Sequence, residues 1–596
     1  MFTTRPELRG TFGMVASTHW LASATGMAML EQGGNAFDAA VAAGFVLQVV
    51  EPHLNGPGGD LPILVHRAGS DAVEVICGQG VAPRAATIDR FKGLGLEIVP
   101  GTGLLAACVP GAFDAWIAML RDYGTMELEA VMAPAIGYAR DGYPLVPGIV
   151  AAIAAVEDLF RTEWPSSAAV YLPRGQVPGL RTLFRNPVLA ATYQRIVDEA
   201  RATGGSRERR LDAARDLFYR GFVAEAIGRY CATTEAMDTS GRRHRGLLTA
   251  DDMAGWQARI EPPLAVDYHG WRVFKPGVWS QGPVLLQQLA LLDGLPLAQL
   301  DPLGPDFVHT VVEGAKLAFA DRDAWYADPD HVDVPAATLI GADYAGRRRG
   351  LIDPDRASTA LRPGDIGRGR PFIPSGDPVE PEALKAAGAA GFGEPTVRHT
   401  GHMPGDTCHL DAVDRWGNMV SATPSGGWLH SSPVIPELGF CLGTRMQMFW
   451  LDPQAAAALA PGRRPRTTLS ASMALDGSGG GIAFGTPGGD NQDQWATTLF
   501  LRWLHHGLDA QAAIDAPMFD MVHFPSSFYP RATVLNRLNI EGRFAPETVA
   551  ELSRRGHQVA VQGDWALGRL SMAGKRGAER FAAANPRFMQ GYAVGR

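Results

Sequence analysis

The residues with the clearest chemical potential lie between Gly405 and Gly427, where Thr407 stands at the start of a predicted β-hairpin. From Cys408 onwards apolar and polar residues alternate, as in a strand with one buried face. Asp414–Gly417 is typical of a turn, and Asn418–Thr423 is typical of the returning strand. A cut just before Thr407 would place a free α-amine beside its own hydroxyl, where that amine could act as a base. A threonine at the start of a hairpin is unremarkable by itself, so Thr407 is a candidate nucleophile only if the chain is cut there; the thiol of Cys408 is the alternative nucleophile.

A second candidate feature is the glycine pair Gly488-Gly489, in the segment Thr-Pro-Gly-Gly. The pair follows two predicted strands, Ala471–Leu475 and Ile482–Gly485, and precedes a predicted helix from about Asn491 to His506. Two glycines between a strand and a helix can leave adjacent backbone N–H groups pointing the same way, and such groups can stabilise an oxyanion. A plain tight turn is the alternative, and only the threonine hypothesis favours the oxyanion site over it.

The upstream sequence predicts elements that would hold these two features in place. A strand at Met14–Ser17 is followed by helices at Trp20–Gln32 and Ala36–Val50, and the second helix is apolar almost all round, which is typical of a buried helix. A glycine-rich turn at Asn55–Asp60 then leads into a strand at Leu61–His66. Such a turn can bind an anion, although reversing the chain is its commoner role.

Two further helices are predicted in the middle of the chain, at Val284–Leu292 and Phe307–Trp325. On the second helix, Glu313 and Lys316 are three residues apart, which predicts an ion pair at the surface. The segment Pro363–Asp406 is rich in proline and glycine and has few apolar runs, so it predicts a mobile segment outside the core. This segment ends directly before the hairpin.

Composition and charge argue against several classes of function. The 596-residue chain has a net charge of −8, a pI of about 6.0 and no face-sized basic block, so nucleic acid is not expected as a partner. The five cysteines are widely spaced without a CxxC pair, and we expect neither a disulfide scaffold nor a metal site. Gly101-Thr102-Gly103 lacks the third glycine of a dinucleotide fingerprint because Ala106 stands there, which leaves a nucleotide-dependent oxidoreductase with little support.

The sequence also predicts where the protein resides. The amino-terminal stretch has no basic region followed by an apolar run, so no signal peptide is expected. The longest apolar run, Ala39–Val50, is interrupted by Gln48 and is too short to span a bilayer. We therefore expect a soluble, cytoplasmic protein without a membrane partner.

Four stretches of the sequence resemble the γ-glutamyltranspeptidase family of N-terminal nucleophile hydrolases. In the family's order they read GMVASTHWLASATGMAMLEQGGNAFDAAVAAGFVLQVVEPHLNGPGG, FADRDAWYADPDHVDVP, GDTCHLDAVDRWGNMVS and FGTPGGDNQ, and the likeness runs from Gly13 to beyond Pro517. Agreement of several independent stretches in one order is very improbable by chance. The resemblance implies an α+β fold, the N-terminal nucleophile hydrolase αββα sandwich, in which two stacked antiparallel sheets lie between helical layers.

The resemblance further implies that the precursor cuts itself between Asp406 and Thr407. The products would be a large subunit, residues 1–406, and a small subunit, residues 407–596, which together form one αββα domain. Thr407 would then attack an amide carbonyl with its own α-amine as the base, since the reference pKa of such an amine is about 7.7–8.0. Water or an amine would finally accept the acyl group, and no cofactor is implied.

Three other residues gain catalytic roles through the same resemblance. Ser425 stands where the family has a second threonine, whose hydroxyl orients the nucleophile, and a serine can keep that role. Gly488 and Gly489 stand at the family's glycine pair, so their N–H groups would bind the oxyanion. Removing one such donor typically lowers the rate by about 10²–10³-fold.

The residues that grip the glutamyl group in the family are largely changed in this chain. Gln79 replaces the family's carboxylate-binding arginine, and Met448 replaces the aspartate that binds the amino group. Gly427 replaces an asparagine, and Arg445 replaces a glutamine. Thr467 and Thr468 stand at the family's serine pair and keep its hydroxyl groups. Each charge-assisted hydrogen bond contributes roughly 1.5–3 kcal/mol, so losing both charged partners weakens binding by about 10²–10⁴-fold. Arg445 could supply a new carboxylate contact, and a surface or structural role is the alternative.

These observations predict an autoprocessed enzyme that hydrolyses or transfers the acyl group of a small amide, with a γ-glutamyl specificity that the pocket changes put in question. The pocket changes favour a different amide, either a small carboxylate-bearing one or an acylated amine. The substrate-binding residues would be Gln79, Arg445, Thr467 and Thr468. A standard γ-glutamyltransferase or glutathione hydrolase of glutathione metabolism is the alternative. A non-catalytic binding protein is a third possibility, against which the joint presence of the predicted catalytic residues argues.

Overall fold

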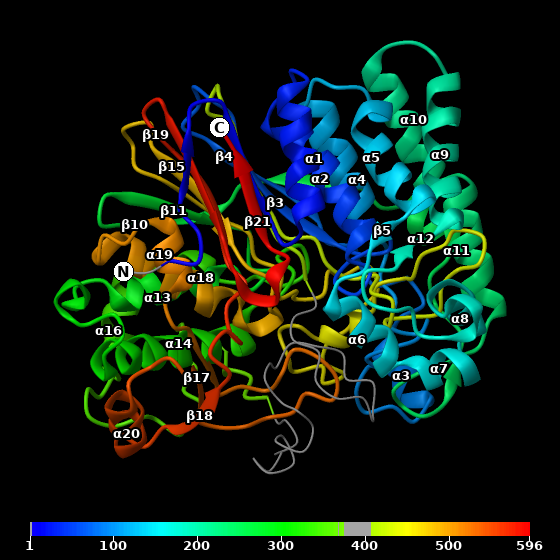
Figure 1. Cartoon of the computed structure of the whole chain (residues 1–596). Helices are drawn as coiled ribbons and strands as arrows, with labels where there is room; N and C mark the ends of the chain where they lie inside the picture. The colour runs from blue at the N-terminus through cyan, green and yellow to red at the C-terminus, as the bar shows by residue number, and fades with distance from the viewer. Residues whose placement is uncertain (1–2, 368, 375–406) are drawn as a thin grey trace.

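The computed structural model describes residues 3–367, 369–374 and 407–596 (Figure 1). Most of the predicted proline- and glycine-rich segment Pro363–Asp406 falls outside these ranges, and so does Asp406, the residue before the predicted cut. The description begins again at Thr407, which is fully buried.

The predicted hairpin forms the centre of a seven-stranded antiparallel sheet. Its strands β12 (Leu410–Asp414) and β13 (Met419–Ala422) pair with each other, and each also pairs with a strand from the amino-terminal part of the chain. The Asp414 carboxylate closes the turn by accepting hydrogen bonds from the backbone N–H groups of Trp416, Gly417 and Asn418. The strand order is β21 (Tyr592–Gly595), β2 (Gly13–Ser17), β12, β13, β3 (Leu61–His66), β4 (Val73–Gly78), β9 (Arg259–Glu261).

A second seven-stranded antiparallel sheet contains the strand that precedes the glycine pair. This strand, β15 (Gly481–Gly485), lies inside the sheet, between β14 and β19. The strand order is β1 (Leu8–Gly10), β20 (Glu579–Ala584), β19 (Ser571–Arg576), β15, β14 (Ser472–Leu475), β11 (Trp271–Lys275), β10 (Leu264–Tyr268).

The two sheets pack against each other through small and apolar side chains. One buried cluster joins Met14, Leu64 and Val413 of the first sheet to Met473 and Ala573 of the second. Helices cover the opposite faces (Figure 1). The first sheet is covered by α1 (Trp20–Glu31), α2 (Ala36–Val50) and α4 (Ala112–Asp122), with α5 (Leu128–Asp141) packed on α2, and the second by α13 (Pro283–Leu292) and α18 (Gln492–His505), with α14 (Pro305–Trp325) packed on α13.

Helix α2 shows how the sequence pattern produces this layering. Every one of its residues is buried, as its all-round apolar pattern predicts, because one face packs on the sheet and the other on neighbouring helices. A capping box between Asn35 and Asp38 satisfies the first backbone N–H groups of the helix. Glu51 caps the carboxyl end of the helix, and the glycine-rich turn follows a few residues later. The turn thereby lies beside Ser425, just after the second strand of the hairpin.

The remaining elements surround this core. The helices are α3 (Ile88–Gly93), α6 (Pro147–Ala155), α7 (Glu157–Thr162), α8 (Pro165–Tyr171), α9 (Pro187–Ala202), α10 (Arg207–Tyr219), α11 (Phe222–Thr233), α12 (Ala250–Ala254), α15 (Ala336–Leu339), α16 (Ala342–Arg349), α19 (Ala510–Asp515) and α20 (Pro546–Arg554). A three-stranded sheet contains β16 (Phe519–Val522), β17 (Arg537–Glu541) and β18 (Gln558–Gln562). Two two-stranded sheets pair β5 (Tyr143–Pro144) with β6 (Leu183–Phe184) and β7 (Ala236–Met237) with β8 (Arg243–His244).

The predicted fold class is confirmed at the level of a mixed helix-and-sheet protein with antiparallel sheets. The prediction of a surface ion pair between Glu313 and Lys316 is wrong. The two side chains do pair, at 2.7 Å, but both are buried because α14 is covered on several sides, and the Lys316 ammonium also donates to Asn536. In the part of the chain that the structure describes, no helix is both long and apolar enough to cross a membrane.

Candidate active site

Thr407 lies immediately before the central strand β12 and is held beside the strand that returns from the hairpin. Its neighbour Cys408 donates a backbone hydrogen bond of 2.9 Å to the carbonyl of Pro424, and Thr407 itself forms a β-bridge with Ser425. The hydroxyl oxygens of Thr407 and Ser425 are 3.2 Å apart, and both residues are almost completely buried. The structure therefore brings together the predicted nucleophile and the hydroxyl predicted to orient it.

Ser425 is fixed by Asp60, a residue for which the sequence predicts no role in the site. The two residues exchange backbone hydrogen bonds of 2.8 and 3.0 Å, so the glycine-rich turn before Asp60 serves as a clamp on the hairpin end. The Asp60 carboxylate in turn accepts a bidentate ion pair from Arg445, at 2.7 and 2.8 Å. Burial raises the pKa of the Asp60 carboxyl, and the Arg445 guanidinium opposes that rise. Arg445 is thus buried, and the surface role considered for it is excluded.

Replacement of Arg445 with methionine is expected to destabilise the protein by about 3–5 kcal/mol, because it leaves the buried Asp60 carboxylate without its counter-ion. Urea unfolding of the single variant measures this loss. The double variant Asp60→Asn with Arg445→Met should recover part of it, since it buries no unpaired charge. Equal stability of the single variant and the wild type would show that the pair does not hold the clamp.

The thiol of Cys408 contacts a polar cluster formed by Glu51 and Thr18. It donates a hydrogen bond of 2.9 Å to Glu51, and Glu51 also accepts one of 2.6 Å from Thr18. Burial raises the pKa of the Cys408 thiol well above its ordinary value, and the adjacent Glu51 carboxylate raises it further. A nucleophilic thiolate is therefore disfavoured at this position, and the geometry favours Thr407 over Cys408.

The glycine pair lies close to the hairpin because β15 runs beside β12 in the facing sheet. The His409 ring lies where a side chain on Gly485 would have to stand: a Cβ built at Gly485 would come within 2.4 Å of it. Three residues after this contact, the chain reaches Gly488. The end of β15 and the start of β12 therefore meet at one edge of the two sheets, and this juxtaposition could not be deduced from their separation in the sequence.

The peptide units around the glycine pair are held by hydrogen bonds to their carbonyl oxygens. The Thr486 hydroxyl donates to the Pro487 carbonyl at 2.7 Å, and the Asn491 N–H donates to the Gly488 carbonyl at 2.9 Å. In a trans peptide unit the C=O and N–H bonds are antiparallel, so each of these bonds also sets the direction of the next N–H group. Among the hydrogen bonds of the described residues, none is donated by the N–H of Gly488 or Gly489. The directions of both N–H groups are thus set by neighbouring contacts, and neither group is used in another hydrogen bond of the described residues.

Gly488 has a φ of +127°, and a Cβ at this position would come within 2.4 Å of the Trp495 ring. Replacing Gly488 with alanine should therefore shift the loop and lower kcat by about 10²–10³-fold, the effect of losing one oxyanion donor. Steady-state kinetics of the purified variant give the measurement. The matched control is Gly479→Ala, because Gly479 also has a positive φ, of +94°, but has open space around it. A normal kcat in the Gly488→Ala enzyme would show that this loop is not part of the active site.

The residues predicted to bind substrate are all buried. Thr467 pairs with the segment Trp279–Gln281 through backbone hydrogen bonds of 2.9 and 2.8 Å. Thr468 Oγ1 and Gln79 Oε1 are buried oxygen atoms without a hydrogen-bond partner in the described part of the chain, while Gln79 Nε2 donates to the Gly80 carbonyl at 3.1 Å. Unsatisfied buried polar atoms are rare in native proteins, and ligand binding is one reason for them.

Met448 belongs to a small apolar cluster beside Arg445. It packs with Trp428 and Phe528, and all three side chains are buried. The indole N–H of Trp428 donates to the Leu54 carbonyl at 2.8 Å, and the Arg445 guanidinium lies 5.4 Å from the centre of the Trp428 ring. The cluster presents no charge at the position where the family has its amine-binding aspartate.

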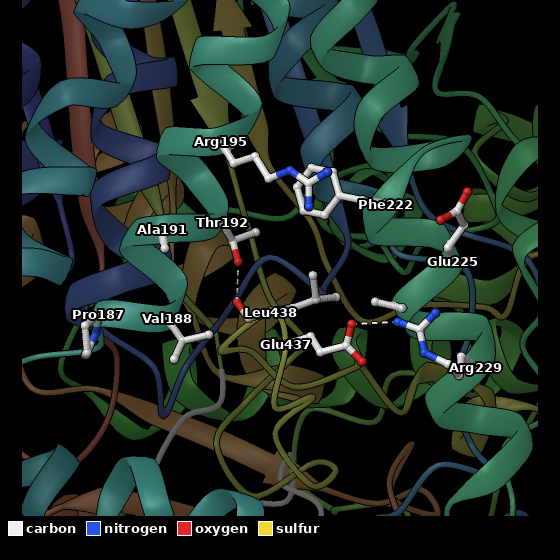
Figure 2. A pocket seen from close by; sticks show the side chains of 11 residues that line it. Pro187, Val188, Ala191, Thr192, Arg195, Phe222, Glu225, Arg229, Glu437 and Leu438 are labelled. Carbon is white, nitrogen blue, oxygen red and sulfur yellow. Dashed lines mark hydrogen bonds and ion pairs between the residues drawn. The ribbon is translucent and has the colours of Figure 1, made fainter.

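A separate surface groove of about 570 Å³ lies between α9 and α11 (Figure 2). An ion pair of 2.6 Å between Arg229 and Glu437 crosses it, and Phe222 and Leu438 contribute apolar surface. None of the predicted site residues lines this groove. Within the described ranges, no group of three or more His, Cys, Asp and Glu side chains is arranged to hold a metal ion.

Comparison with known proteins identifies the family to which the chain belongs. Residues 22–595 match the gamma-glutamyltranspeptidase family. The oxamate amidohydrolase proenzyme of Klebsiella pneumoniae is 30% identical over 562 residues, which cover 93% of this chain and 92% of that protein. A solved structure described as "Structure of LmbA2991HD" is 52% identical with a TM-score of 0.92, with both chains covered completely. The structure of cephalosporin acylase from Bacillus halodurans is 28% identical with a TM-score of 0.82, covering 100% of this chain and 97% of that one.

The two solved structures share the overall fold of this chain. The names oxamate amidohydrolase and cephalosporin acylase refer to different acyl substrates. The family match extends over nearly the entire chain, and it includes both the hairpin and the glycine pair. This protein therefore belongs to the gamma-glutamyltranspeptidase family, as an N-terminal nucleophile amidohydrolase or acyltransferase.

Proposed function

We propose that the protein is made as a precursor that cleaves itself between Asp406 and Thr407. The Thr407 hydroxyl attacks the carbonyl carbon of Asp406, the peptide C–N bond breaks, and water hydrolyses the resulting ester. Residues 1–406 and 407–596 then remain together as large and small subunits of one αββα domain, because both fragments contribute strands to both seven-stranded sheets. The buried Thr407–Ser425 contact of 3.2 Å supports this proposal, since it places a second hydroxyl against the attacking one.

The same threonine then acts on a small amide substrate. The free α-amine takes the proton from the Thr407 hydroxyl as the oxygen attacks the substrate carbonyl, and the N–H groups of Gly488 and Gly489 stabilise the oxyanion. Collapse of the tetrahedral intermediate breaks the amide C–N bond, and the leaving amine carries away the proton. Water or a second amine attacks the acyl ester on Thr407, which releases the acid or a new amide and regenerates the enzyme.

The acyl group is proposed to be neutral and largely apolar. One observation carries this proposal: Arg445, the cation among the predicted binding residues, is already neutralised by its bidentate ion pair with Asp60. A γ-glutamyl group would bring a carboxylate and an ammonium into this pocket, and neither would meet a free opposite charge on Gln79 or Met448. The Trp428–Met448–Phe528 cluster suits an alkyl or aromatic acyl chain, and the unsatisfied oxygens of Gln79 and Thr468 can accept a hydrogen bond from a neutral N–H or O–H group.

Analysis of the purified wild-type protein tests the proposal directly. We expect two fragments on a denaturing gel, with a 190-residue small fragment whose amino-terminal sequence begins Thr-Cys-His, from Thr407. The preparation should also hydrolyse an alkanoyl or arylacetyl anilide. A fully active preparation that consists of the intact chain would contradict the proposed processing, and a processed preparation that accepts no amide would contradict the proposed chemistry.

A further inference from the structure

The glycine pair is tied to the rest of the protein by a buried side chain that no catalytic role yet explains. Gln281 lies just before α13, and its side-chain Nε2 donates a hydrogen bond of 3.0 Å to the Gly489 carbonyl. Its backbone N–H donates to the Thr467 carbonyl at 2.8 Å. Gln281 therefore touches both the loop predicted to hold the oxyanion and the segment predicted to bind the substrate.

Arg322 of α14 holds the Gln281 side chain in its orientation. Its Nη1 donates to Gln281 Oε1 at 3.0 Å and also contacts the Asp490 carboxylate. An amide group can be rotated so that its oxygen and nitrogen exchange places, but here the oxygen faces a guanidinium and the nitrogen faces a carbonyl. Only one orientation satisfies both partners, so Arg322 forces the amide N–H toward Gly489.

The same arginine fixes the residue that follows the glycine pair. Asp490 pairs with Arg322 in a completely buried ion pair, and its second oxygen accepts the backbone N–H of Ser527 at 2.9 Å. The guanidinium is also packed between aromatic rings, 4.6 Å from the centre of Phe319 and 4.7 Å from that of Phe524. The Arg322 guanidinium thus restrains the loop at two points: directly at the Asp490 side chain, and through Gln281 at the Gly489 carbonyl.

We propose that Gln281, held by Arg322, is a positioning residue: it anchors the Gly489–Asp490 peptide unit and thereby limits movement of the glycine pair, so that the N–H groups of Gly488 and Gly489 stay in place for oxyanion stabilisation. The proposal rests on the proposed function of this loop. Left-handed glycines such as Gly489, with a φ of +52°, have a wide choice of backbone conformations, and the loop needs external restraints to keep one of them. A displacement of about 1 Å at a reacting centre can lower the rate by roughly 10²-fold.

The informative substitution is Gln281→Glu in the processed enzyme. Glutamate has nearly the same shape and can still pair with Arg322, but its carboxylate cannot donate a hydrogen bond to the Gly489 carbonyl and repels it. We expect kcat to fall by about 10- to 100-fold, while KM changes by less than threefold, because the restraint acts on the transition state. The inhibition constant of a boronic acid that carries the same acyl chain should rise in parallel with the loss of kcat, since a boronate adduct mimics the tetrahedral oxyanion.

The matched control is Gln287→Glu, six residues further along. Gln287 is likewise buried and polar, but it bonds to Asp321 and Tyr326 and does not contact the glycine loop. This variant should lose stability in thermal unfolding and keep the wild-type kcat. If Gln281→Glu does not accumulate as processed enzyme, Gln281→Met, which removes the donor without adding charge, takes its place in the same assays.

The results separate failure of this inference from failure of the proposed function. The positioning role alone would be overturned if the Gln281 variants kept the wild-type kcat. It would also be overturned if the Gln287 variant lost as much kcat as a Gln281 variant of the same stability. Amide turnover by the Thr407→Ala variant at the wild-type rate would instead overturn the proposed function. Parallel changes in kcat and boronate inhibition, confined to the Gln281 variants, are the expected outcome.

Discussion

Replacing Thr407 with alanine is expected to leave the protein as one intact chain of 596 residues that turns over no amide. The hydroxyl is proposed to be the nucleophile both in self-cleavage and in catalysis, so its removal stops the two reactions together. Ser425 cannot take over, because it lies within the chain and would have no free α-amine after a cut at Thr407. Loss of a hydroxyl nucleophile in a comparable hydrolase lowers kcat by about 10⁶-fold, and a denaturing gel with an anilide assay measures both effects.

Two variants of the same hairpin make this result specific. Thr407→Ser keeps a hydroxyl on the first residue and should still give two fragments, at a lower rate. Cys408→Ala should give two fragments and near-normal activity, because the Cys408 thiol is engaged by Glu51 and buried. Cleavage of the Thr407→Ala chain at the same bond, or loss of cleavage in Cys408→Ala, would show that the nucleophile has been assigned to the wrong residue.

The wild-type enzyme is expected to prefer a neutral acyl anilide over γ-glutamyl anilide by roughly 10²–10⁴-fold in kcat/KM. This range corresponds to two missing charge-assisted hydrogen bonds of about 1.5–3 kcal/mol each. The physical reason is the state of Arg445: its charge is neutralised by Asp60, and the residues that replace the family's arginine and aspartate are the uncharged Gln79 and Met448. Parallel kinetics with γ-glutamyl, alkanoyl and arylacetyl anilides give the ratio.

Gln79→Arg provides a matched variant for this comparison. A guanidinium at position 79 would offer a carboxylate a charged partner, so we expect the discrimination against the γ-glutamyl substrate to shrink by at least tenfold. The neutral substrates should gain nothing from the change. Robust γ-glutamyl turnover by the wild-type enzyme would mean that another cation binds the substrate carboxylate and that the pocket is not neutral.

Local sequence patterns predicted the elements around the site with good accuracy. The helix Ala36–Val50 and the strand Leu61–His66 have the predicted bounds, and the hairpin after Thr407 forms as expected. These segments were predictable because each has a pattern that only one local structure satisfies: all-round apolar residues in a buried helix, alternation in a strand, and a turn closed by Asp414.

Several contacts of the site could not be predicted in this way. Asp60 and Arg445 are 385 residues apart, and Gln281 and Gly489 are 208 apart, so no local pattern relates them. The sequence leaves a surface role open for Arg445 because no local pattern reports whether a single arginine side chain is buried. Glu313 and Lys316 have the spacing of a surface pair, and their burial results only from how other elements cover α14.

The sequence by itself therefore determined the secondary structure near the site, because local patterns depend on residue type and short spacing. The nucleophile candidate, the role of the glycine pair and the changes in the acyl pocket came from the resemblance of the sequence to the family. Only the tertiary structure decided that Arg445 is neutralised by Asp60, that the Cys408 thiol is bound to Glu51, and that Gln281 and Arg322 restrain the glycine loop. These contacts depend on which buried groups meet across the two sheets. Buried polar groups must find partners, and the fold alone decides which partners are within reach.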